Sequence, residues 1–138
     1  MKTPGGNDWR DATLRYLARA DKLAKQRDDC LAMIDVIMND TANRVVADCG
    51  IEPGQIWRHL VSNRLQRILA WHTAWYLKDD MPILRINVVT LWLREDFEPR
   101  KAGGRDGRRS IVPLRHFGFV YEDGVVSSDN RPVLKRVR

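Results

Sequence analysis

The chain has 138 residues, of which 43% are hydrophobic and 30% are charged, and its formal net charge is +6. This composition excludes a disordered chain and indicates one globular domain that is long enough to bury a core without staples. Residues 1–80 hold 12 Lys/Arg against 11 Asp/Glu, whereas residues 81–138 hold 12 against 7. The basic second half makes a polyanion the first partner to consider, although many small proteins are simply basic.

Cysteine and histidine positions give no sign of a metal or cofactor. Cys30 and Cys49 have no C-x-x-C partner, and His59, His72 and His116 are dispersed along the chain. A metal site would have to be assembled entirely by the fold, so we expect neither a metal nor a cofactor. Two free, buried thiols are typical of a reducing compartment.

The hydrophobic stretches are short. The N-terminal MKTPGGND has a lysine but no apolar run after it, which is unlike a signal peptide. The longest uncharged stretches, Ile68–Leu77 and Ile86–Leu93, are too short to span a bilayer. We therefore expect a soluble, cytoplasmic protein that does not contact a membrane.

The first predicted element is helical and covers residues 8–38. Its apolar residues recur at helical spacing on one face; they are Leu17, Ala20, Ala24, Leu31, Ile34, Ile37 and Met38. Asp28 and Asp29 could cap a second helix starting at Cys30, so the pattern leaves open one long helix or two. Such a stripe usually packs within its own chain, but it could also form a dimer seam.

Two more helices are predicted next. Asn39, Asp40 and Thr41 offer N-cap side chains for a short helix over residues 41–48, and Gly50 suits its C-terminal cap. A longer helix is predicted from Pro53 to Lys78. Its buried stripe would contain Trp57, Leu60, Val61, Leu65, Ile68, Trp71, His72 and Trp75. This helix lacks Asp and Glu, so it could lie against phosphates without repulsion.

Beyond Pro82 the residues favour strands. Residues 83–94 are rich in Ile, Val, Leu, Thr and Trp, although the unbroken apolar run could also be a buried helix. A polar loop over 95–110 leads to a strand over 111–121, and Asp123-Gly124 is a strong hairpin signal. Residues 133–137 read as a last short strand or a basic tail.

The predicted fold class is therefore α+β. We expect a single domain over residues 1–138, with a helical half over 8–80 and a β half over 82–138. Two to four helices, including a helix-turn-helix-like pair, would pack on a small antiparallel sheet with a long basic loop.

The spacing around Gly50 resembles that of a DNA-binding helix-turn-helix. Val46 and Ile56 lie four residues before and six residues after this glycine, where that motif places a small and a β-branched residue. Gln55, Arg58, His59 and Ser62 would then face the major groove. The alternative is an ordinary helical hairpin with a solvated basic face.

Two further basic segments could contact phosphates. The loop contains Arg100, Lys101, Arg105, Arg108 and Arg109 among three glycines, and it could act as a groove-reaching arm or be a solvated loop. The C-terminal residues 131–138 carry four cations and no carboxylate, which suits either phosphate contacts or a solubilising end.

The aromatic residues have two interpretations. The five Trp residues mostly fall on apolar stripes and are expected in the core. Phe117, Phe119 and Tyr121 alternate onto one sheet face with Arg115, and they could form a platform for a single strand or cover the helices.

Catalysis finds little support. Asp96, Glu98 and Lys101 weakly suggest a metal-dependent nuclease, but Pro99 interrupts the strand on which they would have to stand. A metal-free RNase toxin would need Arg115, His116, Tyr121 and Lys135 together.

These observations favour a non-enzymatic nucleic-acid-binding protein, a small DNA-binding regulator or accessory factor that acts as a homodimer, with DNA favoured over RNA. The alternative is a protein-interaction module, an inhibitor or assembly subunit that binds an acidic protein partner. The candidate nucleic-acid-binding residues are Gln55, Arg58, His59, Ser62, Asn63, Arg64, Arg67, Arg100, Lys101, Arg105, Arg108, Arg109, Arg115, Lys135 and Arg136.

Overall fold

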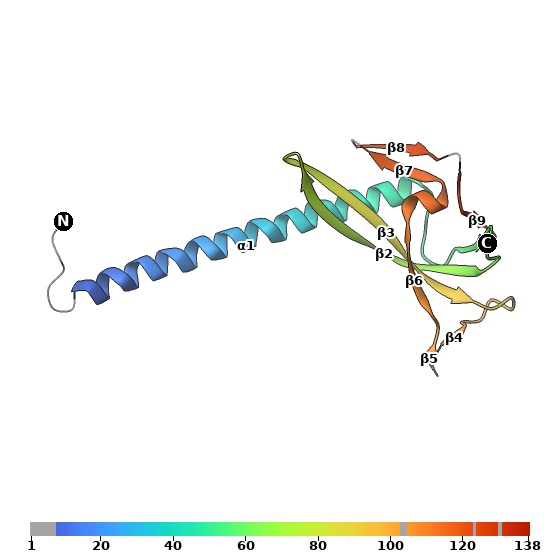
Figure 1. Ribbon diagram of the computed structural model, residues 1–138, viewed down its shortest axis with the longest axis horizontal. Helices are drawn as coiled ribbons and strands as arrows, with labels where there is room; N and C mark the ends of the chain where they lie inside the picture. The colour runs from blue at the N-terminus through green and yellow to red at the C-terminus, as the bar shows by residue number, and fades with distance from the viewer. Residues whose placement is uncertain (1–7, 103–104, 123, 130) are drawn as a thin grey trace. The chain divides into compact units, whose positions relative to one another are not determined.

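The computed structural model describes residues 8–102, 105–122, 124–129 and 131–138. It contains one long helix, α1 (Asp8–Asp48), followed by strands and a short 3-10 helix (Figure 1). The chain divides into two compact units, one ending at Ile37 and one starting at Met38. The first unit is the exposed N-terminal part of α1, and the second contains the last turns of α1 and all the strands.

The main sheet has five antiparallel strands in the order β6-β3-β2-β1-β9. Their bounds are β1 Ile56–His59, β2 Leu65–Lys78, β3 Met81–Leu93, β6 Arg109–Pro113 and β9 Leu134–Arg136. The two long strands, β2 and β3, pair along almost their whole length with one irregularity between Ile68 and Ala70. The turn that joins them, Asp79-Asp80, has positive φ at both residues (51° and 61°), as a tight two-residue hairpin requires.

Two small hairpins complete the strands. The first pairs β4 (Lys101–Ala102) with β5 (Arg105–Asp106) inside the basic loop. The second pairs β7 (Phe119–Glu122) with β8 (Val125–Ser128), and a 3-10 helix, η1 (Leu114–Phe117), links β6 to β7. The predicted hairpin around Gly124 is therefore confirmed, while its first turn residue, Asp123, lies outside the described residues.

The core lies between the last turns of α1 and one face of the main sheet. Ala42 and Val46 on the helix are fully buried against a cluster that includes Ile68 and Val88 from the two long strands. Two hydrogen bonds cross from the sheet to the helix and fix its register. Trp71 Nε1 donates to Asn43 Oδ1 (2.8 Å), and Thr73 Oγ1 donates to Asn39 Oδ1 (2.7 Å).

Gly50 ends α1 as the sequence predicts. Its φ is +71°, its N–H donates to the Ala47 carbonyl, and the N–H of Ile51 donates to the Val46 carbonyl. This pair of bonds is a Schellman motif, and the buried side chains of Ile51 and Val46 supply its usual hydrophobic contact. The cap turns the chain directly into the sheet.

The prediction of two to four helices with a helix-turn-helix pair is wrong. α1 is the one α-helix among the described residues, and it runs through residues 8–38 and 41–48 without a break. The predicted helix from Pro53 to Lys78 consists of β1, a turn and β2. In β2 the side chains alternate between half-buried and exposed from residue 69 to residue 76, because Trp71, Thr73 and Trp75 form one face.

The predictions for the β half are mostly confirmed. The strand over 83–94 is β3, and the strand over 133–137 is β9. The strand over 111–121 is interrupted, because Leu114–Phe117 form η1 and leave β6 and β7 in different sheets. Among the helices of the described residues, none combines the length and apolar character that a membrane span needs.

Candidate nucleic-acid interface

Trp92 lies near the end of β3 and meets residues from both neighbouring strands. The register places Gln66 of β2 directly opposite Trp92 on one side. On the other side, the backbone N–H of Trp92 donates to the Arg108 carbonyl (2.7 Å), which places Arg108 beside it. Arg64 comes directly before β2, and its side chain reaches the Trp92 ring. Pairing of distant strands thus places two arginines around one indole.

Both arginines contact the indole ring. The guanidinium carbon of Arg64 lies 3.3 Å from the ring centroid of Trp92, and that of Arg108 lies 4.2 Å from it. These are cation–π distances, at which the electron-rich face of an indole attracts a guanidinium. The ring restrains both arginine side chains. Their remaining N–H groups can therefore bind a ligand with little further loss of side-chain conformational entropy.

The cluster is strongly cationic. Burial lowers the pKa of the Arg64 guanidinium, and the nearby charges of Arg100 and Arg108 lower it further. Within the described residues, Arg64, Arg100 and Arg108 form no ion pair with a carboxylate. Like charges held this close repel one another and favour an anion between them. We call these three arginines with Trp92 the arginine–tryptophan cluster.

Two buried donors in this cluster have no acceptor. Arg64 Nε and Trp92 Nε1 are shielded from solvent and have no hydrogen-bond partner among the described residues. A buried N–H without an acceptor is costly and is uncommon in folded proteins. These two atoms are inaccessible from outside, so a ligand with anionic oxygens would bind the other guanidinium N–H groups of the cluster.

A hollow lies next to the cluster. It has a volume of about 520 Å³ and is lined by the turn before β2, the end of β3 and the start of the basic loop. Its lining residues are Ser62, Asn63, Arg64, Leu65, Leu93, Arg94, Glu95 and Arg100. The lining is mainly polar and includes Arg64 and Arg100 of the cluster. The hollow is large enough for a phosphate group together with part of its sugar.

Two arginines at the rim are already paired. Arg58 makes two contacts with Glu95 (3.0 and 3.2 Å) and also donates to the Asn63 carbonyl (2.9 Å). The hydrogen bond from Arg58 is the main reason that the pKa of Glu95 is lowered. Arg94 pairs with Asp96 at 3.1 Å. Glu95 and Asp96 are thus neutralised by Arg58 and Arg94, and not by the arginines of the arginine–tryptophan cluster.

Two predicted binding residues have structural roles instead. Gln55 is buried, donates to the Gly50 carbonyl (2.7 Å) and accepts from Trp57 Nε1 (3.2 Å), so it cannot contact a base. His59 Nδ1 accepts the backbone N–H groups of Val61 and Ser62 and closes the turn before β2. The predicted recognition helix does not exist, so these residues share no helix face.

The remaining predicted residues lie at several places on the strands. Arg67 donates to the Phe97 carbonyl (3.3 Å), and Arg109 is exposed on β6. Lys135 and Arg136 are exposed on β9, and Lys101 is exposed on β4. The side chain of Arg105 lies outside the described residues. The structure therefore brings together Arg64, Arg100 and Arg108, with Ser62 and Asn63 beside them in the hollow.

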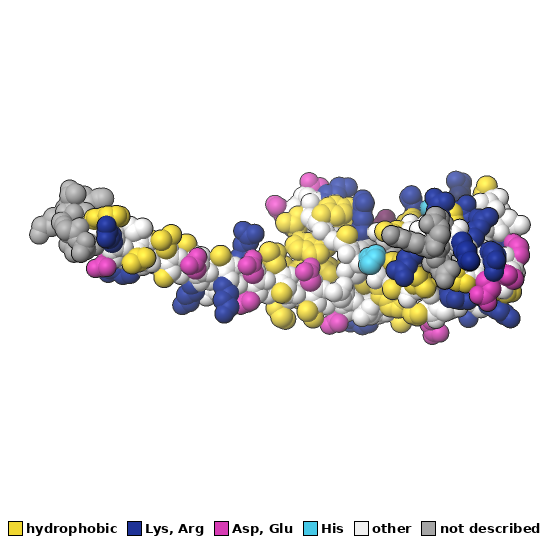
Figure 2. Space-filling view, turned by 90° about the horizontal axis from the view of Figure 1, so that it is seen from below, with side chains coloured by type: hydrophobic (Ala, Val, Ile, Leu, Met, Phe, Trp, Pro, Cys, Tyr) yellow, Lys and Arg dark blue, Asp and Glu magenta, His cyan; other side chains and the backbone are white. Residues whose placement is uncertain are grey.

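A charge asymmetry extends across the main sheet. None of its five strands carries Asp or Glu. They carry Arg58, Arg67, Lys78, Arg85, Arg109, Lys135 and Arg136. Figure 2 shows Lys and Arg side chains spread over the sheet-bearing part of the molecule, with carboxylates at several places along its edges. The field around the sheet is thus positive on balance.

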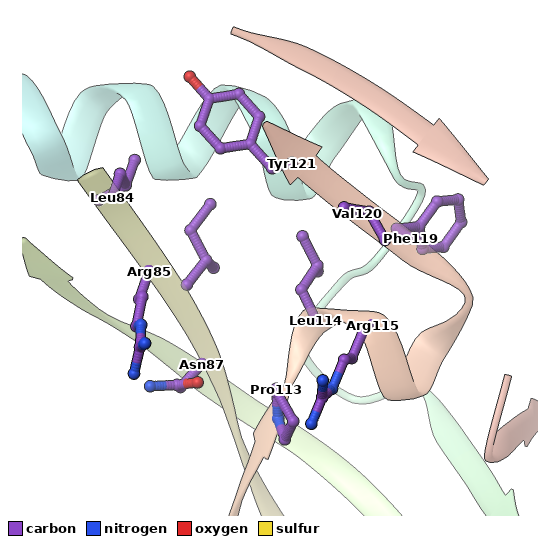
Figure 3. A pocket seen from close by; sticks show the side chains of 10 residues that line it. Leu84, Arg85, Asn87, Pro113, Leu114, Arg115, Phe119, Val120 and Tyr121 are labelled. Atoms are coloured by element: carbon purple, nitrogen blue, oxygen red, sulfur yellow. The ribbon is translucent and has the colours of Figure 1, made fainter. Parts of the chain in front are cut away.

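The four residues that a metal-free RNase site would need do not line one common hollow. A second hollow has a volume of about 370 Å³ and lies between β3, η1 and β7, as Figure 3 shows. Arg115 and Tyr121 line it, whereas His116 and Lys135 do not. Phe119 and Tyr121 pack against the core and Phe117 is buried, so these aromatic residues cover the helix and form no open platform.

The structure also places the cysteines. Cys30 is exposed and Cys49 is buried, so the prediction of two buried thiols is wrong for Cys30. Burial, with a contribution from Asp48, raises the pKa of the Cys49 thiol to about 11. Among the residues that the structure describes, no three His, Cys, Asp or Glu side chains come together in a possible metal site.

Trp92 is the site residue that sequence reasoning misses. The apolar run in which it lies predicts a place in the core, and nothing in that run indicates the arginines that contact it. A usable signal is Arg94, two residues after it, which indicates that the chain reaches solvent directly after β3. Comparison with protein-family models, curated proteins and solved structures gives no match for the chain.

Proposed function

We propose that the protein is a non-enzymatic nucleic-acid-binding protein that holds the phosphate backbone through the arginine–tryptophan cluster. The observation that carries this proposal is the group of three arginines, Arg64, Arg100 and Arg108, which form no ion pair with a carboxylate among the described side chains. A phosphodiester supplies negative charge and oxygen acceptors for the guanidinium groups of these arginines.

The geometry favours backbone contact over base reading. Trp92 has its ring occupied by Arg64 and Arg108, so it is not free to stack on a base. Gln55, the residue best suited to pair with adenine, is buried. Contacts to phosphate position a protein on nucleic acid but carry no sequence information. We therefore propose an accessory factor that binds with little sequence preference, in place of a sequence-reading regulator.

The carboxylate-free sheet supports the same conclusion. A polyanion approaching the arginine–tryptophan cluster meets five strands without a negative side chain. This field would attract nucleic acid from a distance and extend the contact beyond the cluster. Arg100 and Lys101 continue the positive charge into the basic loop.

The proposal is tested by fluorescence anisotropy with labelled single-stranded DNA, duplex DNA and RNA of random sequence, each about 20 nucleotides long, at low salt. We expect binding to weaken by at least about tenfold in Arg108→Gln, since hydrogen bonds between charged groups contribute about 1.5–3 kcal/mol. Arg109→Gln is the matched control, because this adjacent arginine carries the same charge but points to the other face of β6. We expect it to change affinity by about twofold, as one general charge among many would.

The same experiment separates nucleic acid from an acidic protein. Poly-glutamate presents carboxylates at high density without phosphate, so it stands in for an acidic protein surface. If poly-glutamate binds as tightly as all three nucleic acids, the protein-interaction module is the better description. If neither polyanion binds at low salt, or if Arg108→Gln and Arg109→Gln weaken binding equally, the proposed site is wrong.

A further inference from the structure

The N-terminal unit of α1 exposes an unusual amount of apolar side chain. Leu17 and Leu23 are each 55% exposed, and Leu31 is 38% exposed. Figure 2 shows apolar side chains along this helix between charged ones. Contiguous exposed apolar side chains often mark interaction surfaces in soluble proteins. Most helical stability comes from packing an apolar face, so a helix of this kind needs a partner.

One stripe on this helix follows a heptad repeat and contains the exposed Leu17 and Leu31, whereas Leu23 lies beside the stripe. Starting from Leu17, the alternate spacing of three and four residues gives Leu17, Ala20, Ala24, Arg27, Leu31 and Ile34. A seven-residue repeat does not match the 3.6-residue period of a straight helix, so a stripe with this spacing favours a left-handed supercoil around a second helix. In the described part of the chain the only other helix is η1, which has four residues. A second helix of matching length is thus absent from the described part of this chain, and a second copy of the chain can supply one.

The order of large and small residues fits a second copy in antiparallel orientation. If the two helices cross between residues 25 and 26, Leu17 faces Ile34 of the second copy, and Ala20 faces Leu31. Ala24 then faces Arg27. Two of the three distinct layers pair a small side chain with a large one, which is how cores fill space without voids or strain.

A parallel arrangement lacks this fit. It would stack Ala20 on its own copy and Ala24 on its own copy, which leaves two thin layers side by side. It would then place two Arg27 side chains directly against each other in the seam. Like charges in contact in a core are costly, and the thin layers lose packing.

Charge complementarity supports the same arrangement. Asp21 and Asp28 each follow a seam residue by one position, on one edge of the stripe. In the antiparallel pair, Arg27 crosses over Ala24 of the second copy and comes within reach of the second copy's Asp21 and Asp28. Within the described part of its own chain, Arg27 forms no ion pair, and neither does Asp21 or Asp28. In the antiparallel pair, Arg27 of each copy could therefore form ion pairs with Asp21 and Asp28 of the other copy.

We propose that two copies of the chain associate through an antiparallel coiled coil formed by residues 17–34 of α1. This inference does not depend on the arginine–tryptophan cluster, which lies in the other unit. A dimer would display two such clusters, and two linked sites bind a long polyanion more tightly than either site alone.

Disulfide trapping tests both the partner and the orientation. Two full-length variants, Leu17→Cys and Ile34→Cys, are made in a Cys30→Ser background, so that Cys49, which is buried, is the only other thiol. Each variant is oxidised alone and in an equal mixture, and the products are identified by mass spectrometry. In the antiparallel pair, residue 17 faces residue 34, whereas the two copies of residue 17 lie about 25 Å apart along the axis. A disulfide spans about 6 Å between Cα atoms.

We expect a crosslinked dimer only in the mixture, joined through positions 17 and 34. Crosslinking of either variant with itself would show a parallel pair and overturn the proposal. Sedimentation analysis of the uncrosslinked wild type and variants provides the second measurement, and we expect a dimer that Ala24→Glu converts to a monomer. A monomeric wild type, or a dimer that gives no crosslink at either position, would also overturn it.

Discussion

Replacement of Arg64 by methionine is expected to stabilise the fold while it weakens ligand binding. Methionine keeps the aliphatic contact with the Trp92 ring but removes the charge and the N–H groups. The change eliminates the buried Arg64 Nε that lacks an acceptor, and it relieves the repulsion from Arg100 and Arg108. Residues that serve a ligand are often unfavourable for the unliganded fold, so this pair of effects indicates a binding role.

The structure gives the size of the effect. An unsatisfied buried donor costs about 1–3 kcal/mol, and removing Arg64 recovers that cost. The lost cation–π contact is worth about 1 kcal/mol, and a methionine sulfur near an aromatic ring returns part of it. With allowance for the partial exposure of Arg64, we expect unfolding free energy to rise by about 1 kcal/mol. That corresponds to an increase in Tm of about 4 °C for a chain of this size.

Urea unfolding followed by circular dichroism measures this change. Arg58→Met is the matched control, because Arg58 is a neighbouring arginine that has partners at Glu95 and Asn63. Its replacement should lower stability, the opposite sign to Arg64→Met. If Arg64→Met destabilises the fold as Arg58→Met does, then Arg64 is a structural residue and the reasoning about its missing acceptor fails.

Three further predictions concern the fold. Gly50→Ala should lower unfolding free energy by about 1 kcal/mol in thermal melts, because φ is +71° while a new Cβ meets no atom within 4 Å. In thiol labelling at about pH 8, Cys30 should react in the folded protein, whereas Cys49, buried with a pKa of about 11, should react only on unfolding. Burial, followed by Arg115 and His59, lowers the pKa of His116 below its ordinary 6.5. The unfolded chain therefore binds this proton more readily, so stability should fall as pH drops below about 6.5, and His116→Gln should remove that part of the dependence in urea titrations at several pH values.

The sequence predicts the β half and the end of α1 because their signals are local. Gly50 occupies a position where the chain must adopt a left-handed conformation, and Gly124 closes a two-residue hairpin. Residues 65–78 read as helix because Leu65, Ile68, Trp71 and Trp75 also fit a period of 3.6. The pairing of β2 with β3 makes these residues a strand. It joins residues that are up to 28 positions apart, as Leu65 and Leu93 are. Local spacing contains no information on such pairing.

The candidate site is predictable in part. Arg64, Arg100 and Arg108 are among the expected residues because basic charge is visible in the sequence. Their meeting point at Trp92 is not, since it depends on the register of three strands. Conversely, Gln55 looks like a base-reading residue only if it stands on a helix. In the actual fold the same amide supports the turn after α1.

The salt dependence of binding tests the central claim most directly. Three phosphate contacts from Arg64, Arg100 and Arg108 predict a slope of log affinity against log salt of about −2.7 for duplex DNA and about −2.1 for single strands. Duplex affinity would then fall about 40-fold between 50 and 200 mM salt. Arg108→Gln should make the duplex slope shallower by about 0.9, and Arg109→Gln should leave it nearly unchanged. A slope near zero for the wild type, or equal slopes for wild type and Arg108→Gln, would contradict phosphate binding at this cluster.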